Sequence, residues 1–221
     1  MEIGEQTKPN RKWSMYTSQS MRLIDLKEKE ADANCVRTEW AVAGNYDFSK
    51  STQENYLSFP GDRRSFGRYA WARASRDFDY HGNYIRARQE FQDSLVRNVV
   101  GSSSRKDHPW IVFTAGAMGA GKSHVISWMS REGLFPLPDI VIIDPDQFKA
   151  DFPEWPGYCQ KNHKQAGRLT RRESGYLVEV AQEVAMSECK NIWADGSLRD
   201  GQWYEQVFED IRLVSASVLA Y

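Results

Sequence analysis

The sequence predicts an α/β protein with a parallel sheet flanked by helices, preceded by a mainly helical N-terminal region. Three observations support this fold class. From residue 109 onward, apolar segments typical of buried strands alternate with amphipathic segments typical of helices. A glycine-rich segment joins the first of these strands to the helix after it. The residues before 109 favour helix and lack the alternation, which predicts a region of different architecture.

The composition restricts the class of protein further. The chain has 221 residues, of which 41% are hydrophobic, so it can bury a sizeable core. Its 29 Lys and Arg against 30 Asp and Glu give a net charge of −1, which excludes a globally basic nucleic-acid binder. It has no apolar run of the roughly 18 residues that cross a membrane, and no signal-peptide core. Three widely spaced cysteines form no disulfide framework. We therefore expect a cytoplasmic protein without a membrane partner.

A polar, turn-forming segment, GSSSRKDHP at residues 101–109, divides the chain. We expect a mainly helical N-terminal region at 1–108 and an α/β core at 109–221. In the N-terminal region, the expected segments are a short helix at 21–30, a loop at 44–67 and a helix at about 84–100.

The second region is predicted to contain four strands with three helices between them. The expected strands are residues 111–115, 139–144, 191–195 and 213–221. The first helix is expected at residues 122–131, where Val125, Trp128 and Met129 share one apolar face.

The second helix is expected to begin at Thr170. Thr170 and Glu173 have the spacing of a capping box, in which each side chain satisfies a free backbone amide at the helix start. Leu177, Val180, Ala181 and Val184 mark its predicted buried face. The third helix is expected from the stripe formed by Trp203, Val207 and Ile211.

Residues 116–123, Gly-Ala-Met-Gly-Ala-Gly-Lys-Ser, match the phosphate-binding motif G-x-x-x-x-G-K-[ST] in full. Glycines let backbone amides wrap around a phosphate, and the helix start adds partial positive charge. Lys122 would reach the β- and γ-phosphates of ATP, and the Ser123 hydroxyl would bind Mg²⁺. The residues predicted to bind ATP are Gly116, Ala117, Met118, Gly119, Ala120, Gly121, Lys122, Ser123 and His124. The motif makes the predicted sheet a P-loop NTPase or kinase-type sheet.

Two carboxylates follow the second predicted strand. Asp144 and Asp146 are two residues apart, so in extended backbone both would face the same side, at the edge where open α/β sheets bind ligands. Asp144 suits the Mg²⁺ shell, and Asp146 suits a general base that accepts the proton of an attacking hydroxyl. Alternatively, one of the two caps the helix that begins near Gln147.

The third strand also ends in polar residues. Asp195 stands at its carboxyl end, and Arg199 enters the following helix, where it would contact a phosphate. The alternatives are a turn or cap role for Asp195 and a surface salt bridge for Arg199.

With these residues the second region resembles the zeta toxin family of P-loop kinases, especially its eukaryotic members. The resemblance covers about half the chain. The matching stretches are residues 115–125, Ile143-Asp-Pro-Asp-Gln-Phe-Lys149, Glu173-Ser-Gly-Tyr176 and Asp195-Gly-Ser-Leu-Arg-Asp200. The P-loop alone indicates only the superfamily, whereas the two aspartate-rich stretches are more specific.

The resemblance implies ATP-dependent transfer of the γ-phosphate to a hydroxyl of a small acceptor. The bacterial toxins of this family phosphorylate UDP-N-acetylglucosamine, so the implied acceptor is a sugar nucleotide and the implied cofactors are ATP and Mg²⁺. By motif, Lys122 and Ser123 hold ATP and Mg²⁺, and Asp146 is the catalytic base. The implied substrate contacts are Asp144, Glu179, Asp195 and Arg199. A toxin role would require an antitoxin-like protein partner, and no feature of the sequence identifies one.

The sequence departs from the family in one respect. Family members continue beyond a fourth strand into a segment whose arginines clamp the transferring phosphate, whereas this sequence ends at Tyr221. We therefore expect ATP binding with weak phosphoryl transfer. Basic residues at 161–172 are a partial substitute for the clamp, or otherwise a solvated helix start.

Two other functions remain open. One is a polynucleotide or RNA-end kinase. Arginines at 63–76 alternate with aromatic residues, and such side chains can stack on bases and bind RNA. Arginine stems more commonly cover an apolar core, so nucleic acid is the less favoured partner. The other is a catalytically impaired ATP-binding protein.

Overall fold

Three strands form one parallel sheet in the computed structural model, which describes residues 40–117, 119–196 and 201–218. The strands are β1 (Ile111–Thr114), β2 (Val141–Ile143) and β3 (Ile192–Asp195). Their order is β1-β3-β2, so the last strand in the sequence lies between the other two and pairs in parallel with both. The predicted α/β fold, with a parallel sheet and flanking helices, is confirmed.

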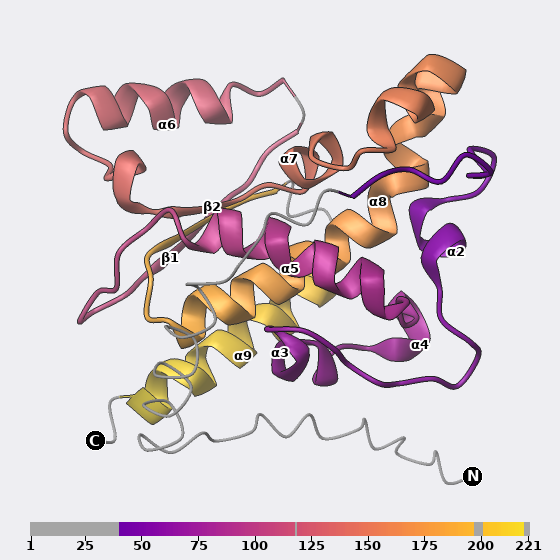
Figure 1. Cartoon of the computed structure of the whole chain (residues 1–221). Helices are drawn as coiled ribbons and strands as arrows, with labels where there is room; N and C mark the ends of the chain where they lie inside the picture. The colour runs from indigo at the N-terminus through magenta and orange to yellow at the C-terminus, as the bar shows by residue number, and fades with distance from the viewer. Residues whose placement is uncertain (1–39, 118, 197–200, 219–221) are drawn as a thin grey trace, which may run out of the picture.

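Helices cover both faces of this sheet. The helices of the described residues are α2 (Thr52–Tyr56), α3 (Ala70–Ala74), α4 (Phe78–His81), α5 (Arg86–Val100), α6 (Lys122–Arg131), α7 (Pro145–Ala150), α8 (Trp155–Ser187) and α9 (Gly201–Val218), with a 3-10 turn at Leu137–Asp139. On one face, Ile126 of α6 packs with Trp193 of β3. On the other, Leu177 of α8 packs with Ile143 and Ile192 of the strands. In Figure 1, α6 lies above the strands and α5 and α9 lie below them, while α8 runs from the upper right of the view down to the lower left.

The main hydrophobic core extends across the boundary predicted at residue 108. Tyr56, Tyr69 and Tyr84 come from before that boundary, and they share one cluster of buried residues with Val141 and Ile143 of β2. Helix α5 contacts both α8 and β2. The N-terminal region therefore contributes directly to the packing beneath the sheet.

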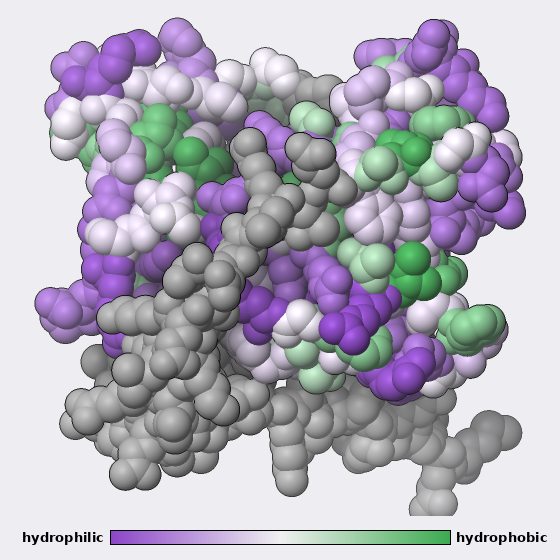
Figure 2. Space-filling view, viewed as in Figure 1, coloured by the Kyte–Doolittle hydropathy of each residue, from purple (hydrophilic) through white to green (hydrophobic). Residues whose placement is uncertain are grey.

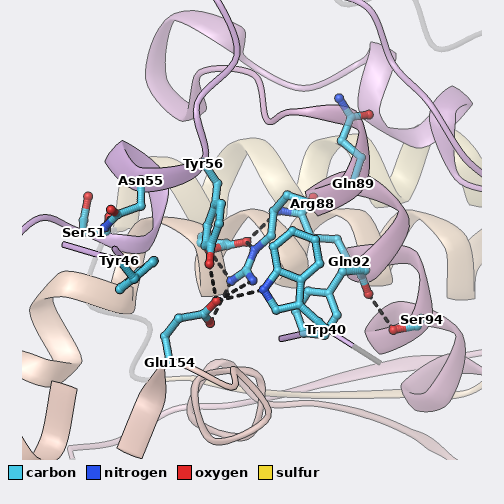
Figure 3. A network of polar contacts seen from close by, with 12 residues as sticks. Trp40, Tyr46, Ser51, Asn55, Tyr56, Arg88, Gln89, Gln92, Ser94 and Glu154 are labelled. Carbon is cyan, nitrogen blue, oxygen red and sulfur yellow. Dashed lines mark hydrogen bonds and ion pairs between the residues drawn. The ribbon is translucent and has the colours of Figure 1, made fainter. Parts of the chain in front are cut away.

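A buried ionic network strengthens this junction (Figure 3). The Arg88 guanidinium of α5 donates from Nε to Glu173 Oε1 at 2.7 Å and from Nη1 to Glu154 Oε1 at 3.0 Å. All three side chains are fully buried. Tyr56 and Trp40 also donate to Glu154 Oε1, at 2.6 and 3.1 Å. Because buried charges need partners, this network fixes α5 against α8 and the turn before it.

The predicted start of a helix at Thr170 is wrong, because Thr170 lies inside α8. Its hydroxyl donates to the carbonyl oxygen of Ala166, one turn earlier, instead of to an amide at a helix start. Ala166 packs with Tyr158 in a separate cluster, so burial extends the helix towards its N-terminus. The interruption in α8 falls at Asn162, whose backbone (φ −161°, ψ 92°) is not helical. The buried face predicted at Leu177, Val180, Ala181 and Val184 is confirmed.

The C-terminal strand expected at 213–221 is also wrong over its described part. Residues 213–218 continue α9, while 219–221 lie outside the described residues. Two residues of α9, Tyr204 and Phe208, pack edge-on against Phe113 of β1. Short apolar runs do not by themselves distinguish a strand from a helix, which explains the error.

Three smaller expectations have different outcomes. The helix at 84–100 is confirmed as α5, whereas the loop expected at 44–67 contains α2, which is capped by Ser51 and Glu54. The helix expected at 21–30 lies outside the described residues.

The apolar face predicted for α6 is only partly buried. Val125 and Trp128 remain 51% and 47% exposed, and Ile126 is the buried contact instead. Figure 2 shows apolar side chains reaching the surface on the side of the molecule that carries α6 and on the side that carries α2 and α4. Within the described residues, every helix is too short or too polar to cross a membrane.

Candidate functional site

The three strands are parallel, so their carboxyl ends lie at the same edge of the sheet. Thr114, the last residue of β1, lies opposite Asp195 of β3, and the P-loop begins two residues later at Gly116. Asp144 follows β2 on the other side of β3. The P-loop and the two carboxylates therefore meet at the carboxyl edge of the sheet, where open α/β sheets bind ligands.

The P-loop has a backbone that depends on glycine. Gly119 (φ 79°) and Gly121 (φ 82°) are both left-handed, a conformation that residues with side chains rarely adopt. Gly121 is also the N-cap of α6, where it offers no side chain to the free amides of the first turn. Those amides remain available to an anion, and the helix dipole favours one there.

The Lys122 side chain turns back onto the backbone of this loop. Its Nζ donates to the carbonyl oxygens of Gly116 at 3.0 Å and Ala117 at 3.4 Å. The same Nζ lies 4.0 Å from Asp195 Oδ1. Ser123 and His124, the next two residues of α6, are exposed. The sequence-predicted lysine is therefore placed between the loop and a strand-end carboxylate.

Asp144 both caps a helix and carries an unfavourable charge. It is the N-cap of α7, and its Oδ1 accepts a hydrogen bond from the Asp146 amide at 2.7 Å. Burial raises the pKa of the Asp144 carboxyl, and the nearby carboxylates of Asp146 and Asp195 raise it further. A cation bound beside these groups would relieve their repulsion.

Asp146 lies in the first turn of α7. Its side chain is 65% exposed, and Oδ1 accepts a hydrogen bond from Lys149 at 2.6 Å. The expectation that Asp144 and Asp146 share an extended backbone is wrong, because the helix begins at Pro145. The alternative, in which one of the two caps the helix, is confirmed for Asp144.

Glu179 belongs to a different group of side chains. It forms an ion pair with Arg76 at 3.4 Å and a hydrogen bond with His81 Nε2 at 3.0 Å. Arg76 also pairs with Glu183, one turn further along α8. These contacts join α8 to the N-terminal region.

Two other predicted site residues, Met118 and Arg199, lie outside the described residues. Sequence reasoning missed Thr114, whose hydroxyl donates to Asp195 Oδ1 at 2.6 Å. The signal for it was its position as the last strand residue before the P-loop. That signal became informative only once β3 was placed beside β1.

The residues at this edge fit ATP and Mg²⁺. The P-loop amides and Lys122 suit a triphosphate. Mg²⁺ is usually held by one or two carboxylates together with phosphate oxygens and water, and Ser123, Asp144 and Asp195 offer a hydroxyl and two carboxylates. In the part of the chain that the structure describes, no group of three or more His, Cys, Asp and Glu side chains could hold a metal ion. One hydroxyl and two carboxylates leave coordination positions for phosphate oxygens and water, so this donor set suits a metal that is bound together with phosphate.

Comparison with known proteins agrees with this geometry. The zeta toxin family model matches residues 93–218, more than half of the chain. None of the curated proteins compared matches significantly. A structure from a study of the PezAT chromosomal toxin–antitoxin system of Streptococcus pneumoniae is similar at 22% identity, with a TM-score of 0.45. The match covers 54% of this chain and 50% of that one, so the chain spans about half the length of that structure. On the family match, this chain belongs to the zeta toxin family of P-loop kinases.

Proposed function

We propose that the chain is an ATP-dependent kinase that transfers the γ-phosphate to a hydroxyl of a small acceptor. The observation that carries this proposal is the placement of Lys122, inside the P-loop and 4.0 Å from Asp195 at the end of β3. A lysine beside phosphate-binding amides and a carboxylate is the arrangement that positions a triphosphate for transfer.

Each remaining site residue has a proposed role. Ser123, Asp144 and Asp195 hold Mg²⁺, which neutralises charge on the phosphates when it is bound. Asp146 accepts the proton of the attacking hydroxyl. Its exposed position at the start of α7 leaves its carboxylate accessible to an acceptor. An ion pair with Lys149 restrains that carboxylate.

For the acceptor we propose a sugar nucleotide such as UDP-N-acetylglucosamine, as in the bacterial toxins of the family. Asp195 and Arg199 are its proposed contacts. Glu179 is not included, since its carboxylate is engaged in an ion pair with Arg76 and a hydrogen bond with His81.

The arginine-rich segment gives no support to a second function in nucleic-acid binding. Two of its exposed arginines are paired, Arg63 with Asp79 and Arg64 with Asp62. Arg73 is buried and pairs with Asp93. Side chains engaged in this way leave less positive charge for a phosphate backbone. This arrangement favours a small acceptor.

The phosphate-binding role can be tested with Lys122→Ala. A charge-assisted hydrogen bond is worth roughly 1.5–3 kcal/mol, so we expect calorimetry to show ATP affinity reduced at least about tenfold. Lys50→Ala is a matched control, because Lys50 is an exposed lysine whose ion pair with Asp47 spans 3.8 Å. Equal ATP affinity in Lys122→Ala and the parent protein would contradict the assignment.

The acceptor can be identified by measuring ATP consumption with UDP-N-acetylglucosamine, free sugars and RNA 5′ ends. Consumption that depends on a sugar nucleotide is the expected result. Consumption with RNA ends alone would support the polynucleotide kinase. ATP binding without transfer to any of these acceptors would instead support a catalytically impaired ATP-binding protein.

A further inference from the structure

We propose that Thr114 is a positioning residue, which holds the Asp195 carboxylate in place for Mg²⁺·ATP. This inference rests on the proposed function. It assigns a role to a residue that lies outside the phosphate-binding motif and contacts neither ATP nor the acceptor in the proposed roles.

The contact between the two residues follows from strand register. Thr114 and Asp195 are directly opposite each other in neighbouring parallel strands, so their side chains project from the same face of the sheet. The Thr114 hydroxyl donates to Asp195 Oδ1 at 2.6 Å. This oxygen is also the one that lies 4.0 Å from Lys122 Nζ.

A second hydrogen bond determines which way the Thr114 hydroxyl points. The Trp193 indole Nε1 lies 3.3 Å from Thr114 Oγ1. An indole nitrogen only donates, so Thr114 must accept from Trp193. Its single proton is then free to point at Asp195. The hydroxyl therefore presents a fixed donor to the carboxylate.

Trp193 provides a rigid base for this arrangement. It is 6% exposed and packs with Ile126 of α6 and Phe135 beneath the P-loop helix. Trp193 and Asp195 are two residues apart in β3, so both lie on the same face as Thr114. The orientation of Asp195 is thus tied to the packing under α6.

Orientation matters because several charges meet at Asp195. Its carboxylate lies beside Lys122 and close enough to Asp144 to raise the pKa of that group. Without the Thr114 hydroxyl, the carboxylate loses the hydrogen bond that restrains its rotation. Metal-binding geometry is sensitive to such supporting contacts, whose loss typically costs 10–100-fold in affinity.

The test is the Mg²⁺ dependence of ATP binding, which is measured by calorimetry. In Thr114→Val, which keeps the shape but loses the hydroxyl, we expect the half-saturating Mg²⁺ concentration to rise about tenfold. ATP affinity without Mg²⁺ should change less than about twofold, since the P-loop is intact. Thr114→Ser should restore the parental Mg²⁺ dependence. If the valine variant does not fold, Thr114→Ala removes the same hydroxyl and carries the same expectation.

Two comparisons separate positioning from a general structural effect. Thr170→Val makes the same chemical change inside α8, where the hydroxyl bonds only along its own helix, and should leave the Mg²⁺ dependence unchanged. In an Asp195→Asn background, Thr114→Val should add less than about a twofold further effect, because coupled residues are not additive. Independent, fully additive effects would overturn the inference.

The outcomes also separate this inference from the proposed function. A parent protein that binds no ATP would overturn both. If the parent protein binds ATP through Lys122 but Thr114→Val leaves the Mg²⁺ dependence unchanged, only the role of Thr114 would be overturned.

Discussion

Asp144 combines a structural contribution with an electrostatic cost. Its carboxylate caps α7, yet burial and the carboxylates of Asp146 and Asp195 raise its pKa. A carboxyl whose pKa is higher in the folded state favours folding most when it is protonated, below its unfolded pKa. It loses that contribution as the pH rises through the folded value. At neutral pH the ionised carboxylate therefore lowers the stability of the folded state. This cost is consistent with the proposed role of Asp144 as a Mg²⁺ ligand, which requires the charge.

Replacement of Asp144 by Asn should therefore stabilise the protein while weakening its proposed function. Asn caps a helix about as well as Asp, so the cap is kept and the repulsion is removed. We expect the melting temperature at pH 7 to rise by about 1–4 °C, and Mg²⁺-dependent ATP binding to weaken.

Thermal unfolding at pH 7 and pH 4 tests the cause. The difference in melting temperature between the Asp144→Asn variant and the parent should shrink at the lower pH, as the parental carboxyl becomes protonated. Asp144→Ala also loses the cap, which costs about 1 kcal/mol. An Asp144→Asn variant that melts below the parent at pH 7 would contradict the electrostatic account.

Asp146 is the residue on which catalysis should depend. General-base assistance is typically worth about 10²–10⁴-fold, so Asp146→Asn should lower acceptor phosphorylation at least about a hundredfold. ATP affinity should change less than about threefold, because the base does not hold the donor. Kinetic assay with the identified acceptor, beside calorimetry with ATP, measures both. Near-parental turnover would exclude Asp146 as the base.

At the scale of elements, one buried guanidinium holds α5 and α8 together. Burial opposes the charge of Arg88, but the carboxylates of Glu173 and Glu154 on either side raise its pKa above the usual value. The guanidinium also stacks over the Tyr56 ring, 4.2 Å from its centroid. Figure 3 shows Tyr56 and Arg88, from the N-terminal region, converging on Glu154 at the start of α8. The network thus also supports the turn that joins α8 to α7.

Loss of this guanidinium should be severe. Arg88→Met leaves two buried carboxylates without their cation, and removal of one partner from a buried pair costs about 3–5 kcal/mol. Urea unfolding should show that loss. Arg86→Met is the matched control on the same helix, since Arg86 is exposed and pairs with Glu90, a contact worth about 0.5 kcal/mol. Adding Glu154→Gln and Glu173→Gln to Arg88→Met should recover part of the stability.

The whole molecule is larger than the segment that carries the family resemblance. The family model begins at residue 93, yet Tyr56, Tyr84 and Arg88 lie before it and are buried against the core. Removing them would expose the apolar surface of α8 and leave Glu154 and Glu173 without the Arg88 guanidinium.

A fragment of residues 93–221 should therefore fail to fold on its own. Apolar burial is the dominant favourable term in folding, and net stability is small, so the loss of the buried residues before 93 removes a large share of that stability. We expect no cooperative thermal transition from the fragment, with the full chain as the control. A cooperative transition at the parental temperature would show that the P-loop region is an independent domain.

Much of the α/β region could be predicted from local sequence. Strands β1 and β3 and helices α5 and α6 follow from short periodic patterns, and eight consecutive residues specify the P-loop. Errors arose where packing over long distances determined the outcome. Thr170 matched a helix start, but burial of Ala166 against Tyr158 kept the chain helical before it.

The candidate site shows the same division. The sequence by itself was enough to assign Lys122, Ser123 and the glycines to the candidate site. A phosphate-binding loop depends on backbone conformations that neighbouring residues determine. The sequence also identified Asp144 and Asp195 as residues at strand ends. Only the tertiary structure decided that β3 lies between β1 and β2, and so placed Asp195 opposite Thr114 and beside Lys122. Strand order depends on how the whole chain buries its apolar faces, so no local sequence pattern predicts it.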